Sequence, residues 1–341
     1  MEASSRFKRF EVLSVKILAH LKILKMKHFS TGEMYVCNLG GSWYHSYVSA
    51  GDIVHVQSEK YLHNTYFVDD RHGLITIEPD KLIWSTWLSN SVSCMRKTWL
   101  SRMFTATATE QIMDEPSLIG EIVHDIFQTA CTEKSYSLPL LKDIKERCLK
   151  EESLLKVCSA NRIDMEQLTE KVDRFLLSIF SWFEEHFHQN SRRNYKLNSV
   201  IDIEESMNSP SLGIEGSLDV TYEVEIHGRP SRKALIPLEL KTGRANTNFS
   251  HGHRIQVMSY SMGMKERGPN RNAGGLLLYL RNKRGEFKPE MSLIEMERWD
   301  EVELLQRRNE LARFMSPQNT NLDGPHFVNS KWLCDNCDGK S

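Results

Sequence analysis

The sequence lacks a long apolar run, a strong net charge and any repeated or low-complexity segment. Because no stretch of about 18 apolar residues occurs, we expect no transmembrane helix. Charged side chains interrupt the N-terminal stretch 7–24, and no small-residue cleavage site follows it, so we expect folded structure there and not a signal peptide. The net charge of −1 neither indicates nor excludes a nucleic-acid partner, which would need a local basic patch.

Cysteine is scarce and odd in number, with 7 residues in a chain of 341. Secreted disulfide frameworks are short and dense in paired cysteines, so this chain is expected in a reducing compartment. Hydrophobic residues make up 40% of the chain and include 7 Trp and 14 Phe, which is enough for a substantial core. The length allows one large domain or two to three ordinary ones.

Residues 1–83 predict a small OB-like β-barrel. Short runs of β-branched and aromatic residues, set apart by Gly, Asp and Pro, occupy 33–43, 51–57, 64–70 and 73–79. Such runs are typical of short strands, and their spacing suits a small antiparallel barrel.

Residues 84–341 predict a second, α/β (α+β) domain. The pattern becomes helical from Ser89, and apolar residues follow one helical stripe within 115–131. Further helices are expected at 138–158, 164–189, 251–267 and 298–315. Strands are expected at 213–226, 233–242 and 273–282.

The strand at 233–242 carries a carboxylate and an ammonium on one face, because Glu239 and Lys241 are two residues apart. An edge strand in water could hold such a pair as a simple salt bridge. However, a hairpin symmetric about Arg229 would place Asp219 opposite Glu239, with Cβ atoms roughly 5 Å apart. Two facing carboxylates repel each other unless a cation lies between them. The hairpin therefore predicts a divalent-metal site, provided that no bulge shifts its register.

A strand ending in Asp, a hairpin and then Glu-x-Lys resembles the core of the metal-dependent PD-(D/E)XK nucleases. The resemblance implies a restriction-endonuclease-like fold and hydrolysis of phosphodiesters. One or two Mg²⁺ ions would screen the anionic substrate, lower the pKa of bound water and stabilise the leaving oxyanion. Lys241 would position the attacking water or help to deprotonate it.

The RecB-like branch of these nucleases has G-x-x-x-H-x-x-F on a preceding helix, which Gly120, His124 and Phe127 match. It also has Gln-x-x-x-Tyr on the following helix, which Gln256 and Tyr260 match. A half-exposed helical histidine and an ordinary polar helix face are the alternatives. The resemblance implies two sets of residues. The metal ligands (Mg²⁺ or Mn²⁺) are His124, Asp219, Glu239 and Leu240, and the catalytic residues are Asp219, Glu239, Lys241, Gln256 and Tyr260.

The positions of three cysteines point to a smaller group within these nucleases. Cys94 precedes the nuclease core, and Cys334 and Cys337 follow it in "CDNC". This arrangement resembles the RecB-like nucleases in which four cysteines hold a [4Fe–4S] cluster. With the blocks "GDIVHV", "SVSCMRKTWLS", "GEIVHDIFQ", "IEGSLDVT", "IPLELKTGR", "HRIQVMSY" and "GLLLYLRN", the chain from about residue 8 to 337 resembles the nuclease domain of the eukaryotic DNA replication ATP-dependent helicase/nuclease family.

Two features depart from that family. The family has a further cysteine after the C-x-x-C, which is missing here, so the cluster is expected to be incomplete or labile. Cys37, Cys131, Cys148 and Cys158 are expected to be core or surface thiols. No G-x-x-x-x-G-K-[ST] motif occurs, so ATPase activity is not expected, and the chain resembles a truncated product, isoform or fragment of a longer protein.

The resemblance implies a Mg²⁺-dependent single-stranded DNA nuclease that acts on flaps and resected ends in DNA replication and repair. Its expected partners are single-stranded DNA, 5′ flap DNA and a single-strand-binding protein, with no membrane. The expected location is the nucleus, with the mitochondrion as a second one. Two alternatives stay open: an iron–sulfur single-strand exonuclease of another RecB-like lineage, and a module that binds single-stranded DNA without cutting it.

Overall fold

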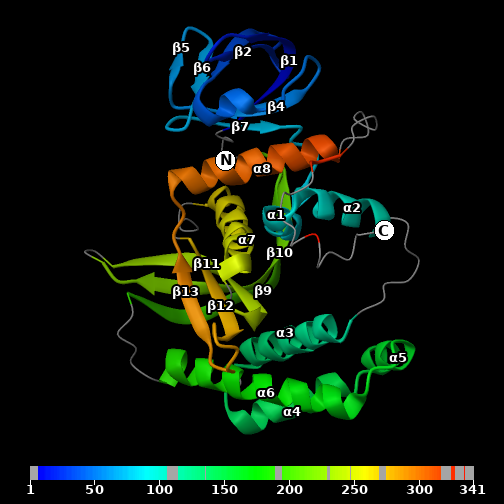
Figure 1. The fold of residues 1–341 in the computed structure, drawn as a ribbon. Coiled ribbons are helices and arrows are strands. Elements are labelled where there is room, and N and C mark those ends of the chain that lie inside the picture. The colour runs from blue at the N-terminus through cyan, green and yellow to red at the C-terminus, as the bar shows by residue number, and fades with distance from the viewer. Residues whose placement is uncertain are drawn as a thin grey trace.

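The computed structural model describes residues 7–105, 114–134, 136–188, 194–228, 231–245, 247–268, 274–315, 324–326 and 334. Figure 1 shows a curled sheet at one end, a second sheet in the middle and a layer of helices at the other end. The predicted mixed α/β fold, an OB-like barrel followed by a nuclease-type core, is confirmed. Within these residues, no helix is both long enough and apolar enough to cross a membrane.

The N-terminal sheet has seven strands in the order β5-β6-β3-β2-β1-β4-β7. The strands are β1 (Lys8–Ile17), β2 (Lys22–His28), β3 (Met34–Leu39), β4 (Ile53–Gln57), β5 (Tyr61–Leu62), β6 (Thr65–Val68) and β7 (Leu74–Ile77). Buried and exposed residues alternate along β2, so one face of the sheet lines the barrel interior. Trp43, on the short 3₁₀ helix η1 (Gly41–His45), is fully buried in the same core.

The second sheet has six strands, with the main order β13-β12-β11-β10-β8 and with β9 also paired to β10. The strands are β8 (Ile83–Trp84), β9 (Tyr195–Ser209), β10 (Ile214–Ile226), β11 (Arg232–Arg244), β12 (Gly275–Arg281) and β13 (Glu290–Ile294). β12 is parallel to β11 and almost wholly buried, as its unbroken apolar run predicts. Because β11 lies between β10 and β12, the alternative of an edge strand in water is wrong.

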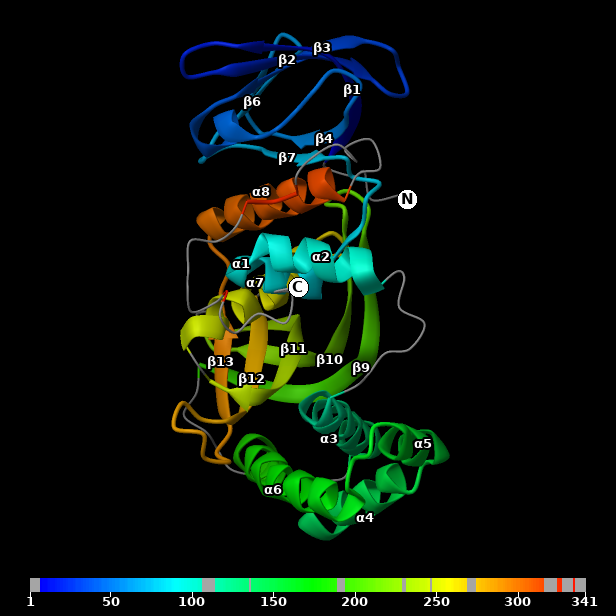
Figure 2. The same ribbon diagram turned by 45° about the vertical axis from the view of Figure 1, so that its right-hand side comes forward.

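Helices cover both faces of this sheet (Figure 2). They are α1 (Ser85–Ser93), α2 (Met95–Thr105), α3 (Glu115–Glu133), α4 (Leu138–Leu149), α5 (Glu152–Ala160), α6 (Met165–Phe183) with a following π-helical turn η2 (Glu184–His188), α7 (Thr247–Lys265) and α8 (Arg298–Phe314). The helices α3 to α6 share one hydrophobic core with one face of the sheet. The helices α1, α7 and α8 share the other core, which continues into the barrel.

Two predictions of secondary structure need correction. The single helix expected at 138–158 is two helices, because α4 ends at its C-cap Lys150 and α5 begins after its N-cap Glu151. The strands β9 and β13 are missing from the prediction, and in β9 polar residues crowd the middle and obscure the alternation.

Helix α8 joins the barrel to the second sheet through two buried polar side chains. Arg308 is fully buried and donates hydrogen bonds to the carbonyl oxygens of Ile77, Glu78, Lys81 and Gly213. The neighbouring Asn309 accepts the Ile77 amide at 2.9 Å and donates to the Ile75 carbonyl at 2.9 Å. Burial lowers the pKa of Arg308 to about 9, so the guanidinium still carries its charge at neutral pH.

Candidate active site

The β10–β11 hairpin has the predicted register. The pairs run from Ile226–Arg232 to Val220–Leu238 without a bulge, so the next position brings Asp219 opposite Glu239. The regular pairing ends there, and the Leu240 amide donates to Asp219 Oδ2 at 2.7 Å. The carboxylate of Asp219 thus accepts a hydrogen bond from a main-chain amide of β11 at the point where the two strands separate.

Glu239 is almost fully buried, with 3% of its surface exposed. Its Oε1 atom accepts hydrogen bonds from Lys241 Nζ at 2.5 Å and from Gln256 Nε2 at 2.8 Å. Its Oε2 atom has no hydrogen-bond partner among the described residues. Burial and the nearby charge of Asp219 raise the pKa of Glu239 to about 7, although Lys241 opposes them.

Helix α7 supplies the other side of the site. Gln256 Oε1 accepts a hydrogen bond from Lys241 Nζ at 3.1 Å, and its Nε2 donates to Tyr260 Oη at 2.9 Å. Tyr260 approaches β10 closely, since a Cβ atom on Gly216 would lie 2.8 Å from Tyr260 Cε1. Burial, with the charge of Glu239, raises the pKa of Tyr260 strongly, so its hydroxyl stays protonated.

Helix α3 brings His124 to the same place. The helix begins at its N-cap Asp114, whose side chain accepts the Ser117 amide at 2.9 Å. Its apolar stripe packs on the sheet and leaves His124 Nδ1 at 3.2 Å from Asp219 Oδ1. Burial lowers the pKa of His124, but the charges of Asp219 and Glu239 outweigh burial, and the net shift is upward.

The structure thus gathers His124, Asp219, Glu239, Lys241, Gln256 and Tyr260 into one cluster. No three His, Cys, Asp or Glu side chains in the described residues already have the arrangement of a metal centre. The donors nevertheless fit a divalent cation, because Glu239 Oε2 is buried, has no hydrogen-bond partner in the described part of the chain, and lies close enough to Asp219 to feel its charge. The side chain of Leu240 is buried and apolar, so only its main chain is available to such an ion.

The predicted cluster cysteines are only partly described. Cys94 lies at the junction of α1 and α2, where its Sγ accepts the Lys97 amide at 3.4 Å. Cys334 is half-buried, and Cys337 lies outside the described residues. Residues 324–326 pack on α2, since Arg96 donates to the Pro325 carbonyl at 3.0 Å. The chain beyond α8 therefore returns to the helix that follows Cys94.

The other four cysteines are thiols, as expected. Cys37, Cys131 and Cys158 are buried, and Cys148 is half-buried. Burial raises the pKa of Cys158 and of Cys148. Each therefore stays protonated at neutral pH and fits a packing role.

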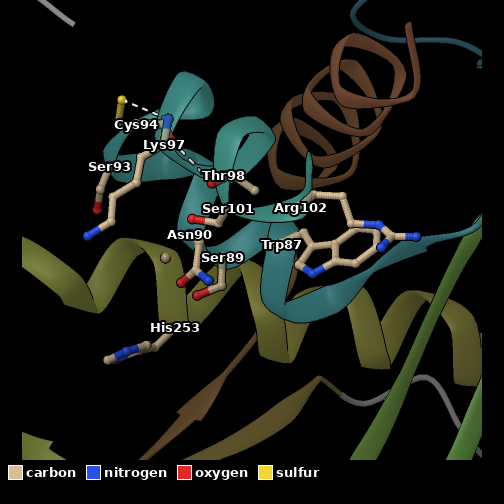
Figure 3. Close-up of a pocket in the computed structure, with 11 residues that line it drawn as sticks. Trp87, Ser89, Asn90, Ser93, Cys94, Lys97, Thr98, Ser101, Arg102 and His253 are labelled. Atoms are coloured by element: carbon tan, nitrogen blue, oxygen red, sulfur yellow. Dashed lines mark hydrogen bonds between the residues drawn. The ribbon is translucent and has the colours of Figure 1, made fainter. Parts of the chain in front are cut away.

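A pocket of about 390 Å³ lies between α1, α2 and α7 (Figure 3). Trp87 and Arg102 lie at one end, with the Arg102 guanidinium 5.0 Å from the Trp87 ring centre. Cys94 and Lys97 lie at the other end, and His253 lines the side formed by α7.

His253 connects this pocket to the acidic cluster. Its Nδ1 atom is 2.7 Å from Tyr279 Oη, and Tyr279 is paired with Lys241 across β11 and β12. Burial, helped by the charge of Lys241, lowers the pKa of His253 to about 4, so its ring is neutral at pH 7. Sequence reasoning missed His253, although it lies one helical turn before Gln256 and so shares its face.

A family model described as DNA replication factor Dna2 matches residues 29–224. The chain is 30% identical over 335 residues to the DNA replication ATP-dependent helicase/nuclease DNA2 of Bos taurus, which covers 89% of this chain and 30% of that protein. It is 31% identical over 300 residues to the protein of that name from Homo sapiens, which covers 81% of this chain and 27% of that protein. The helicase/nuclease JHS1 of Arabidopsis thaliana is 27% identical over 335 residues, which covers 93% of this chain and 24% of that protein.

This chain spans less than a third of the length of these curated relatives. The family match covers more than half of the chain, including α3 with His124 and β10 with Asp219. The relatives align over most of the chain. The chain therefore belongs to the DNA replication factor Dna2 family.

Proposed function

We propose that this chain is a metal-dependent nuclease that hydrolyses phosphodiester bonds of single-stranded DNA. Its substrates would be 5′ flaps and resected ends formed in nuclear DNA replication and repair. The observation that carries the proposal is the buried pair of Asp219 and Glu239, with Lys241 alongside and with Glu239 Oε2 unpartnered among the residues that the structure describes. The relatives named as helicase/nucleases support it.

His124, Asp219, Glu239 and the main chain at Leu240 would hold Mg²⁺ or Mn²⁺. When bound, the ion would lower the pKa of a bound water and stabilise charge on the phosphate. The chain's own residues prepare this role in two ways. Burial keeps water from competing for Glu239, and the Leu240 amide fixes the orientation of Asp219.

Lys241 supplies a cation that is held by two partners. Its Nζ donates to Glu239 Oε1 and to Gln256 Oε1, so the ammonium is fixed at the edge of the carboxylate pair. With 22% of its side chain exposed, Lys241 is accessible to an incoming phosphate. Gln256 and Tyr260 would act by orientation, because their hydrogen bonds lock Glu239 and Lys241 together.

The pocket between α1, α2 and α7 would guide the strand toward this cluster. It combines the cations Lys97 and Arg102 with the indole of Trp87, the combination that binds single strands by charge and stacking. His253 would mark the inner end of this path, because its partner Tyr279 neighbours Lys241.

Cys94, Cys334 and Cys337 would hold an iron–sulfur cluster that joins the start of the nuclease core to its end. The packing of residues 324–326 on α2 supports this, since it brings the later chain back to the Cys94 region. These three cysteines would be three of the four ligands that such a cluster takes. A single-strand-binding protein is the further partner that we propose, and the mitochondrion is a second location.

The second function is a module that binds single-stranded DNA without cutting it. The cations and the indole of the pocket between α1, α2 and α7 would suffice for such binding. The alternative of another RecB-like lineage loses its basis, because the chain belongs to the Dna2 family.

Cleavage of labelled DNA by the purified chain distinguishes the two functions. The substrates are a 5′ flap, a single strand and a blunt duplex, each with Mg²⁺, Mn²⁺ or EDTA. We expect metal-dependent cutting of the first two, and no cutting by Glu239→Gln, which keeps the shape of the side chain but removes its charge. Tight single-strand binding by the wild type without cleavage in either metal would establish the binding module instead.

A further inference from the structure

Asp219 has a second carboxylate neighbour that the proposed mechanism does not use. On the other edge of β10, Leu218 pairs with Glu205 and Val220 pairs with Ile203, so the register places Glu204 of β9 across from Asp219. Asp219 therefore lies between Glu239 on one neighbouring strand and Glu204 on the other.

The backbone at Glu204 is strained. Its φ angle is +51° inside a 15-residue strand, a left-handed conformation that residues with a side chain seldom adopt. Such outliers persist only where surrounding contacts hold them, and they cluster at functional sites. Glycine would adopt this conformation without strain, yet the position carries a glutamate. The contacts of the Glu204 side chain are therefore the place to look for a role.

Both carboxylate oxygens of Glu204 are occupied by partners from the elements that carry the site. Oε1 accepts a hydrogen bond from Gln128 Nε2, and Oε2 accepts one from Ser217 Oγ at 2.6 Å. Gln128 is buried on α3, one turn after His124. Ser217 lies on β10, two residues before Asp219 and on the same face.

Glu204 thus bridges the helix that carries His124 to the strand that carries Asp219. These two side chains meet at 3.2 Å, and their separation depends on how α3 sits on β10. Glu204 is exposed, yet its carboxylate does not simply point into water but turns back onto the sheet and α3. It binds a buried amide and a strand hydroxyl at once.

We infer that Glu204 is a positioning residue, which fixes α3 against β10 and so sets the distance between His124 and Asp219. The inference rests on the proposed function in one respect: these two residues are taken as ligands of the metal. Partners of this kind affect metal affinity by about 10- to 100-fold in other metal sites.

Glu204→Gly separates positioning from simple stability, because it removes the bridge and also relieves the strained backbone. We expect its melting temperature to equal or exceed that of the wild type. Its affinity for Mn²⁺ alone, measured by electron paramagnetic resonance, should fall about tenfold or more. The rate of flap cleavage should fall with it and recover when Mn²⁺ is raised.

Arg162→Gly is the matched control, since Arg162 also has a left-handed backbone, with φ +56°, but is an exposed residue after α5. It should gain stability without changing Mn²⁺ affinity. If Glu204→Gly folds poorly, Glu204→Gln keeps the backbone and one acceptor oxygen and should show a smaller loss of Mn²⁺ affinity.

Mn²⁺ affinity of Glu204→Gly within about twofold of the wild type would overturn the inference, whatever its stability. So would an unchanged Mn²⁺ affinity of Glu204→Gln, in the case where the glycine variant does not fold. A wild-type chain that binds Mn²⁺ but cuts no DNA would instead refute the proposed function. The Mn²⁺ comparison would still decide the role of Glu204.

Discussion

The amide of Leu240 donates to Asp219 Oδ2 at 2.7 Å, two residues beyond Leu238 in the last regular pair of the β10–β11 ladder. A main-chain group of one strand thereby orients a carboxylate of the next. Because this contact uses Oδ2, the other oxygen of Asp219 is left facing His124. The polar cluster of His124, Asp219 and Glu239 thus lies where the pairing of β10 with β11 ends.

Stability should depend on pH through Glu239. Its pKa is raised from 4.5 to about 7 in the folded chain, so folding favours the protonated form. The contribution of this group is full below pH 4.5 and is lost as pH rises toward 7. We expect wild-type melting temperatures, relative to Glu239→Gln, to decline between these pH values in EDTA. Parallel curves for the two proteins would show that Glu239 ionises normally.

Substitutions of Lys241 and of His124 should affect different properties, the cleavage rate and the metal requirement respectively. Lys241→Ala should lower the cleavage rate by about a hundredfold or more at saturating metal, since the lysine serves phosphate and water. His124→Ala should chiefly raise the concentration of Mg²⁺ or Mn²⁺ needed for half-maximal rate. A metal titration of both variants measures this difference. Rescue of Lys241→Ala, but not of His124→Ala, by added metal would reverse the two assignments.

The pocket predicts a salt-dependent loss of DNA affinity in Arg102→Gln. One phosphate contact fewer should reduce the slope of log affinity against log salt by about 0.7 for a single strand. Fluorescence anisotropy with an oligonucleotide in EDTA measures this without cleavage. Arg174→Gln is the control, because Arg174 is exposed on α6 and pairs only with Glu170 among its charged neighbours within the described residues. Equal slopes for both variants would place the DNA elsewhere.

The proposed cluster predicts that Cys94→Ser removes bound iron and the brown colour from anaerobically purified protein, whereas Cys158→Ser does not. Cys158 is buried within the core of α5 and its neighbours, while Cys94 stands at a helix junction. Iron and sulfide analysis together with the visible spectrum provide the measurement. Colour that survives Cys94→Ser and disappears in Cys158→Ser would mean that another thiol set binds the iron.

The sequence allowed the hairpin register and the pairing of Gln256 with Tyr260 to be predicted, because strand and helix periods fix those relations locally. It could not place Glu204 or His253. Glu204 itself has the left-handed backbone conformation, and it lies inside a strand whose apolar alternation is weak. His253 contacts Tyr279 of β12, and this contact depends on how α7 lies across the sheet.

The hydrogen bonds of Arg308 also determine where the chain can be cut or extended without loss of stability. Three of its carbonyl acceptors (those of Ile77, Glu78 and Lys81) belong to the barrel side, and one belongs to the β9–β10 turn. A chain cut between them would leave a buried cation with most of its acceptors missing, a severe penalty in an apolar interior. The barrel and the sheet should therefore melt together in a single calorimetric transition, and insertions or fusions are better tolerated outside 77–81 than within it.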